Sequence, residues 1–171
     1  ICHWHLQLAD VLYRRFTGAF LPSLRDEGRA AVTRDKVIGW LGAEGPARWT
    51  LSTRIQYASK LLTSAQAAGL IGARRDPRPL ITPRVPDAAL AYLLYLLRGL
   101  EFEGTLLANP YLNSVGLAGE SLVVRVRDLP EVRLEKQGGL VHFDWRYADL
   151  SEWAETRLQP AATLETLEAR R

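Results

Sequence analysis

The chain has 171 residues, of which 47% are hydrophobic and 24% charged, and this composition excludes an intrinsically disordered protein. Cys2 is its only cysteine, so an intramolecular disulfide is excluded as well. The longest apolar run, residues 88–97, is too short for a membrane span, which needs about 20 residues. We therefore expect a cytoplasmic protein without a membrane segment.

Charge is distributed unevenly along the chain, although the formal net charge is only +3. Residues 1–100 carry 14 basic and 7 acidic side chains, whereas residues 101–171 carry 8 and 12. Within residues 48–84 there are seven basic side chains, and Asp76 is the only acid. Such crowding of like charge favours a polyanionic partner for the middle of the chain.

The first elements in chain order are predicted to be helices. Apolar residues at helical spacing predict a helix over residues 6–24 that breaks near Gly18 or Pro22. A short helix over residues 34–43 follows, with Thr33 as its N-cap. After a turn at residues 42–46, a longer helix is expected.

This longer helix starts at Thr50 or Ser52 and ends at Gly69. Its predicted buried face consists of Leu51, Ile55, Ala58, Leu62 and Ala65. Its predicted polar face, which contains no acid, consists of Thr53, Arg54, Gln56, Tyr57, Lys60 and Ser64.

A β-hairpin over residues 70–84 is predicted next, because two short apolar pairs flank an arginine-rich, proline-interrupted turn. A short helix, a turn, a longer helix and a basic hairpin follow one another in the order of a winged helix-turn-helix. In that fold the second helix enters the major groove of DNA.

The C-terminal part is predicted to be helical as well. An apolar core helix occupies residues 87–99, a hairpin with a turn at residues 137–139 follows, and a closing helix begins at Asp149 or Ser151. The fold class is thus mainly α, with winged helix-turn-helix character and one or two short β-hairpins. We divide the chain into a basic half over 1–85, a second helical half over 86–158 and a peripheral tail over 159–171.

Candidate DNA-binding residues follow from these assignments, since arginine and lysine suit phosphate, and arginine and glutamine suit base edges. They are Arg48, Thr53, Arg54, Gln56, Tyr57, Lys60, Arg74, Arg75, Arg78 and Arg84.

Catalytic motifs are missing from the sequence: it contains neither G-x-S-x-G nor a Walker A motif. The Cys2-His3-x-His5 cluster could supply part of a zinc site, but the only other His or Cys in the chain is the distant His142. We therefore expect no metal. We expect a non-enzyme with no cofactor and no small-molecule substrate.

Three stretches resemble the BrxA family, the accessory proteins of BREX phage-defence systems. They are WTLSTRIQYASKLLTSAQAAGLI, ALAYLLYLLRGLEFEGTLLANPYL and VRLEKQGGLVHFDWRYADLSEWAE, and the resemblance covers residues 48–156. Its motifs are the helix start at 49–53, the exit at 69–71, the core helix at 91–96 and the strand at 139–145. It implies a mainly helical protein with winged-helix character, similar in part to NusB. It also implies a non-catalytic antiviral role on double-stranded DNA beside other BREX proteins, and identifies no DNA-reading residues.

Two other functions stay open from the sequence. The acidic C-terminal half would suit a protein–protein adaptor within the defence complex. RNA binding, by analogy with NusB, is a third reading, with Tyr57 as the one aromatic available for base stacking near the basic segment.

Overall fold

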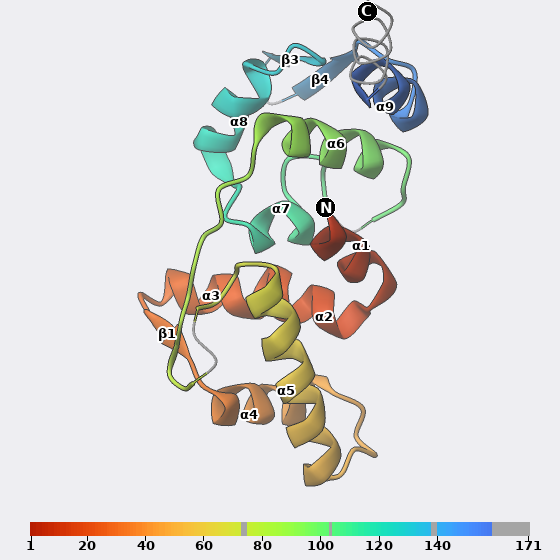
Figure 1. The fold of residues 1–171 in the computed structure, drawn as a ribbon. Helices are drawn as coiled ribbons and strands as arrows, with labels where there is room; N and C mark the ends of the chain where they lie inside the picture. Colours follow the sequence, from red (N-terminus) through yellow and green to blue (C-terminus); the bar gives the residue numbers. More distant parts are fainter. Residues whose placement is uncertain (73–74, 103, 138–139, 159–171) are drawn as a thin grey trace, which may run out of the picture. The chain divides into compact units, whose positions relative to one another are not determined.

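The computed structural model describes residues 1–72, 75–102, 104–137 and 140–158. It is mainly helical, and within these ranges it contains two small antiparallel sheets of two strands each (Figure 1). The mainly α prediction is therefore confirmed. The predicted tail over 159–171 lies outside the described residues.

Two compact units make up the chain. The first combines Ile1–Val85 with Glu103–Gly119, and the second combines Pro86–Phe102 with the residues from Glu120 onward. The predicted halves are each contiguous in sequence, whereas the first unit takes a segment from beyond residue 85.

The N-terminal helical segment of the first unit breaks at Asp10. It consists of α1 (Cys2–Ala9), α2 (Val11–Arg15), the π-helical η1 (Phe16–Phe20) and α3 (Leu21–Asp26). Asp10 caps α2, since its carboxylate accepts a hydrogen bond from the Tyr13 amide at 2.9 Å. The prediction of a break near Gly18 or Pro22 is wrong, because Pro22 lies in the first turn of α3, where its missing N–H is tolerated.

Gly18 marks a close approach between η1 and α7 (Pro110–Ser114). A Cβ placed on Gly18 would lie 2.6 Å from both the Cβ and the carbonyl oxygen of Pro110. Two side chains of α1 also bond to this helix. The Trp4 indole donates to the Tyr111 carbonyl at 3.2 Å, and the His3 Nε2 lies 2.9 Å from the Ser114 hydroxyl. The segment after residue 103 is thus part of the core of the first unit.

The middle of the first unit contains β1 (Ala31–Val32), α4 (Arg34–Glu44), α5 (Leu51–Ala67) and β2 (Arg78–Pro79). Both helices begin at their predicted caps: the Thr33 hydroxyl accepts from the Lys36 amide at 3.3 Å, and the Thr50 hydroxyl accepts from the Thr53 amide at 3.2 Å. Beyond α5, Gly69 has a φ of +73°, a conformation that glycine adopts without strain. The predicted boundaries of α5 are confirmed.

Three short extended segments pair beside these helices. Ala31 pairs with Pro79 and Val32 with Arg78, while Ile71 pairs with Leu80 on the other side, all antiparallel. Segment 78–81 therefore lies between 30–32 and 70–72. The pairing of Ile71 with Leu80 confirms the predicted hairpin.

The second unit is built on α6 (Asp87–Arg98), which buries six side chains, and it also contains α8 (Gly119–Arg127), β3 (Val132–Gln137), β4 (Leu140–Trp145) and α9 (Leu150–Leu158). Strands β3 and β4 form the predicted hairpin, with Val132 opposite Trp145, although its Gly138-Gly139 turn lies outside the described residues. The Tyr95 hydroxyl donates to the Glu131 carbonyl at 2.9 Å and accepts from the Tyr147 amide at 3.1 Å. Asp149 caps α9, as predicted.

Across the described ranges, every helix is too short or too polar to cross a lipid bilayer.

Candidate nucleic-acid interface

The loop between Gly72 and Arg78, called the basic loop below, is tied to the start of α4 by Asp76. One carboxylate oxygen of Asp76 accepts from the Arg34 backbone amide at 2.6 Å, and the other accepts from the Arg78 Nε at 3.0 Å. The amide of Arg34, and then the Arg78 guanidinium, hold the pKa of the Asp76 carboxyl below its usual range. The only acid of the basic segment thus anchors its loop.

The Arg78 side chain is held inside the fold by this arrangement. It is only 7% exposed and forms an ion pair with Asp76. As a candidate for phosphate contact it is therefore placed inside the base of the loop and not on the surface. Arg75, in contrast, is exposed, and Arg74 lies outside the described residues.

The solvent-exposed face of α5 differs from the predicted one by part of a turn. The buried side chains of α5 are Ala58, Leu61, Leu62 and Ala65, and none of them lies in its first two turns. Leu51 and Ile55, which we expected in the core, are 59% and 38% exposed. That expectation is wrong because the side of the first turns that packs toward α4 contains Arg54, and Leu51 and Ile55 lie away from it.

Four predicted polar-face residues, Thr53, Arg54, Tyr57 and Ser64, are only partly exposed. The Tyr57 hydroxyl donates to the Asp10 carboxylate at 2.7 Å, and its ring packs against Trp49 with 4.7 Å between ring centroids. Burial, together with this bond, raises the pKa of Tyr57 to about 12. Arg54 packs toward α4, where a Cβ on Gly42 would meet its guanidinium at 2.9 Å, and Thr53 bonds to Thr50. Tyr57 is therefore engaged within the fold and not presented for base stacking.

What α5 presents to solvent is a row of residues three and four apart. The first turns contribute Ser52, Ile55 and Gln56, and the row continues with Ser59, Lys60 and Thr63. Ser59 is half-buried and the other five are exposed. The row contains no acid. Sequence reasoning missed four of these six residues, because apolar Ile55 was assigned to the core and the face was rotated accordingly.

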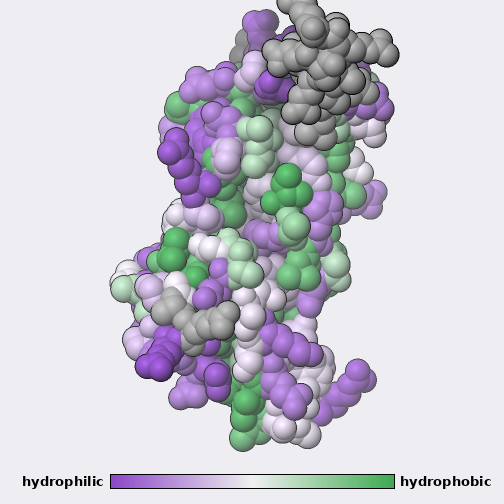
Figure 2. All heavy atoms as spheres, viewed as in Figure 1, coloured by the Kyte–Doolittle hydropathy of each residue, from purple (hydrophilic) through white to green (hydrophobic). Residues whose placement is uncertain are grey.

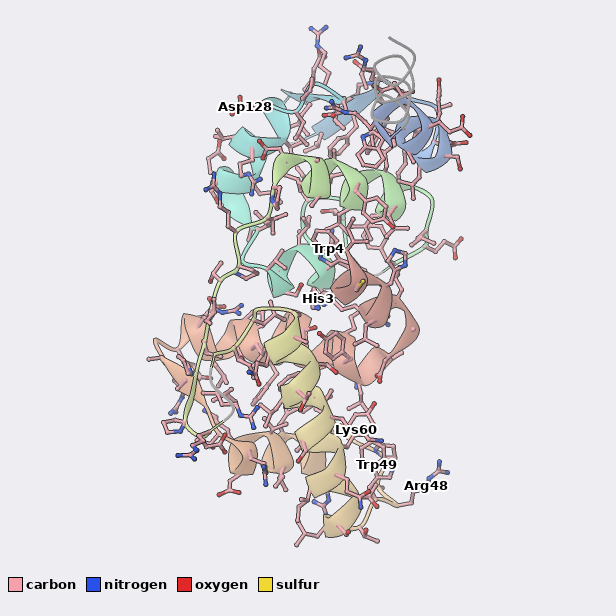
Figure 3. The ribbon with its side chains drawn as sticks, viewed as in Figure 1. His3, Trp4, Arg48, Trp49, Lys60 and Asp128 are labelled. Atoms are coloured by element: carbon pink, nitrogen blue, oxygen red, sulfur yellow. The ribbon has the colours of Figure 1, made fainter. Side chains whose placement is uncertain are left out.

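Four of the predicted basic residues are exposed and form no ion pair with another described residue. These are Arg48, Lys60, Arg75 and Arg84. Figure 3 shows Arg48 extending outward from the segment before α5, with Lys60 on the same side of the helix. In the view of Figure 2, hydrophilic side chains gather on both sides of the α4–α5 end of this unit, with a narrow hydrophobic strip between them. The first unit therefore presents exposed basic side chains that have no ion-pair partner among the described residues.

Within the described residues, no group of three or more His, Cys, Asp or Glu side chains is placed to hold a metal ion. His3 is engaged through both ring nitrogens, with Nδ1 lying 2.9 Å from the Tyr13 hydroxyl and Nε2 lying 2.9 Å from the Ser114 hydroxyl.

No protein-family model matches the chain, and neither a curated protein nor a solved structure shows significant similarity to it.

Proposed function

We propose that the chain is a non-catalytic protein that binds duplex DNA through α5 and the basic loop. The observation that supports this most is the arrangement of β1, α4, α5 and the hairpin after α5. Segment 78–81 lies between 30–32 and 70–72, and the basic loop connects 70–72 to 78–81. This order is the one expected of a winged helix, in which the second helix of the pair enters the major groove and the loop is the wing.

The side chains fit this reading. Lys60 on α5 and Arg75 in the wing are suited to phosphate oxygens, since both are exposed and form no ion pair with another described residue. Gln56, exposed one turn before Lys60, has the amide that reads adenine in the major groove. Arg48 and Arg84 are exposed as well and add positive charge to the same unit.

The resemblance to the BrxA family extends this proposal. It assigns the chain to a bacterial BREX phage-defence system as a cytoplasmic accessory protein. In that system it would act on DNA beside the other BREX proteins.

A second candidate function, a protein–protein adaptor, is favoured by one observation. Leu51 and Ile55 are exposed apolar side chains on successive turns of α5, and such pairs recur where a helix contacts another protein.

The test is binding to a fluorescent duplex of random sequence across a salt series. We expect a log–log salt slope of roughly −4 to −5, corresponding to about four to six phosphate contacts. A Lys60→Ala/Arg75→Ala variant should lower the magnitude of that slope by about 2. An Arg127→Ala/Arg133→Ala variant is the matched control, since it removes two exposed arginines of the second unit and the same charge.

Equal losses in the two double variants would point to unspecific charge attraction and contradict the proposed interface. A folded protein that does not bind duplex DNA at about 50 mM salt would favour the adaptor.

A further inference from the structure

The exposed row on α5 contains an apolar feature that phosphate binding does not use. Ile55 lies between Ser52 and Gln56 in this row and is 38% exposed, and Leu51, one turn earlier, is 59% exposed. The buried side chains of the helix begin only at Ala58, so both Leu51 and Ile55 precede its buried stripe. In the proposed function, on which this inference rests, the row faces the major groove.

The major groove offers one apolar group to a protein, the C5-methyl of thymine. An aliphatic side chain gains by covering it, since both lose contact with water. The neighbouring Gln56 has an amide that can donate to N7 and accept from N6 of adenine, so Ile55 and Gln56 suit the two halves of one base pair or of adjacent pairs.

The spacing along the helix is consistent with a short site. Leu51 and Ile55 are about 6 Å apart along the axis, which corresponds to roughly two base pairs at about 3.4 Å each. Apart from Lys60, the remaining members of the row are small or already bonded. Ser59 donates its hydroxyl to the Ile55 carbonyl at 3.0 Å, and Thr63 donates to the Ser59 carbonyl at 2.8 Å. Their hydroxyl protons are therefore directed to the helix backbone.

Charge complementarity points to DNA as the occupant of this surface. The row contains no acid, and Lys60 continues it one turn beyond Gln56. The exposed Arg75 of the wing adds to the same unit's positive surface. An apolar protein partner would have to leave these charges uncompensated.

We infer that α5 reads A·T base pairs in the major groove, with Ile55 and Leu51 covering thymine C5-methyl groups and Gln56 bonding to adenine.

The experiment compares three fluorescent duplexes of equal length at one salt concentration: an A·T-rich duplex, the same duplex with every thymine replaced by uracil, and a G·C-rich duplex. Uracil lacks only the C5-methyl and keeps the pairing and the O4 acceptor. We expect the protein to bind the thymine duplex about three- to tenfold more tightly than the uracil duplex.

A Leu51→Ala/Ile55→Ala variant should bind the thymine and uracil duplexes equally, and Gln56→Ala should reduce the preference for A·T-rich over G·C-rich DNA. Val124→Ala is the control, because Val124 is 49% exposed on α8 and its replacement removes a comparable apolar side chain from the second unit. Its uracil sensitivity should equal that of the unmodified protein. Thermal unfolding of each variant measures whether the fold is retained. We expect it to be, since the substituted side chains are exposed.

Salt-dependent binding that is equal for the three duplexes would overturn this inference and leave the proposed DNA binding standing. The same holds if the Leu51→Ala/Ile55→Ala variant stays as sensitive to uracil as the unmodified protein. Failure to bind any duplex would overturn both.

Discussion

At the residue scale, Asp76 shows how one acidic side chain can bury a nearby arginine that the sequence leaves looking exposed. Its carboxylate bonds to the Arg34 amide and to the Arg78 guanidinium, so it caps α4 and closes the base of the basic loop at once. Of the arginines predicted to contact phosphate, Arg78 is thereby buried. Charge counts along a sequence cannot distinguish such a buried cation from a free one.

Replacing Asp76 by Asn is expected to lower the free energy of unfolding by about 1–2 kcal/mol, since a charged cap and an ion pair are lost. The folded pKa of Asp76 lies below its unfolded value, so its contribution is complete above about pH 4 and declines as pH falls through the folded pKa. Urea unfolding at pH 7 and at lower pH measures both effects. Asp26→Asn, at an exposed position of α3, is the control and should change little.

His3 provides a second pH dependence. Burial lowers its pKa from 6.5 to about 4, so between these values the unfolded chain binds a proton that the folded chain does not. Stability should therefore fall by about 2 kcal/mol as the pH drops from 7 to 4.5. The variant His3→Gln should flatten this part of the urea-midpoint profile. The exposed His5 is the matched site, and a profile flattened equally by His5→Gln would contradict the assignment.

At the scale of elements, replacing two glycines in helical segments by alanine is expected to change stability in opposite directions. Gly18 in η1 has the backbone of Pro110 within 2.6 Å of where a Cβ would lie, whereas Gly39 in α4 has nothing within 4 Å. Gly18→Ala should therefore destabilise the protein by about 1–3 kcal/mol, because η1 and α7 would have to separate. Gly39→Ala should stabilise it by about 0.5–1 kcal/mol through helix propensity. Thermal denaturation of the two variants compares them directly, and stabilisation by both would refute the close approach.

The helix boundaries in the middle of the chain were predictable, whereas the orientation of α5 was not. Thr33, Thr50 and Gly69 act on backbone groups within a few residues of themselves, so their effect is readable locally. Which side of α5 is covered depends on where α4 ends against it. Leu51 and Ile55 have the spacing of core residues, yet they precede the part of α5 that is buried.

At the scale of the whole molecule, the first unit is discontinuous in sequence. Its helix α7 comes after residue 103 and receives contacts from His3, Trp4 and Gly18. A fragment of residues 1–85, the predicted N-terminal half, lacks this helix and would expose its buried partners. We therefore expect that fragment to unfold without a cooperative transition.

A matched variant isolates the cause. Residues 86–103 are replaced by a flexible Gly/Ser linker in a chain that ends at residue 119, so that α7 is restored without α6. This variant should regain a cooperative urea transition. A cooperative transition in the 1–85 fragment alone, with the same midpoint, would show that α7 is dispensable.

The sequence alone determined the helical class, the start and end of α4 and α5, both hairpins and the positive charge of the middle segment. These features depend on caps, turn residues and apolar periodicity, which act between neighbours along the chain. Only the tertiary structure decided that Arg78 is buried against Asp76, that Tyr57 bonds to Asp10, that α7 belongs to the first unit and that Ile55 faces solvent. Each of these depends on which distant segment packs against the residue, and the local sequence pattern does not indicate which segment that is.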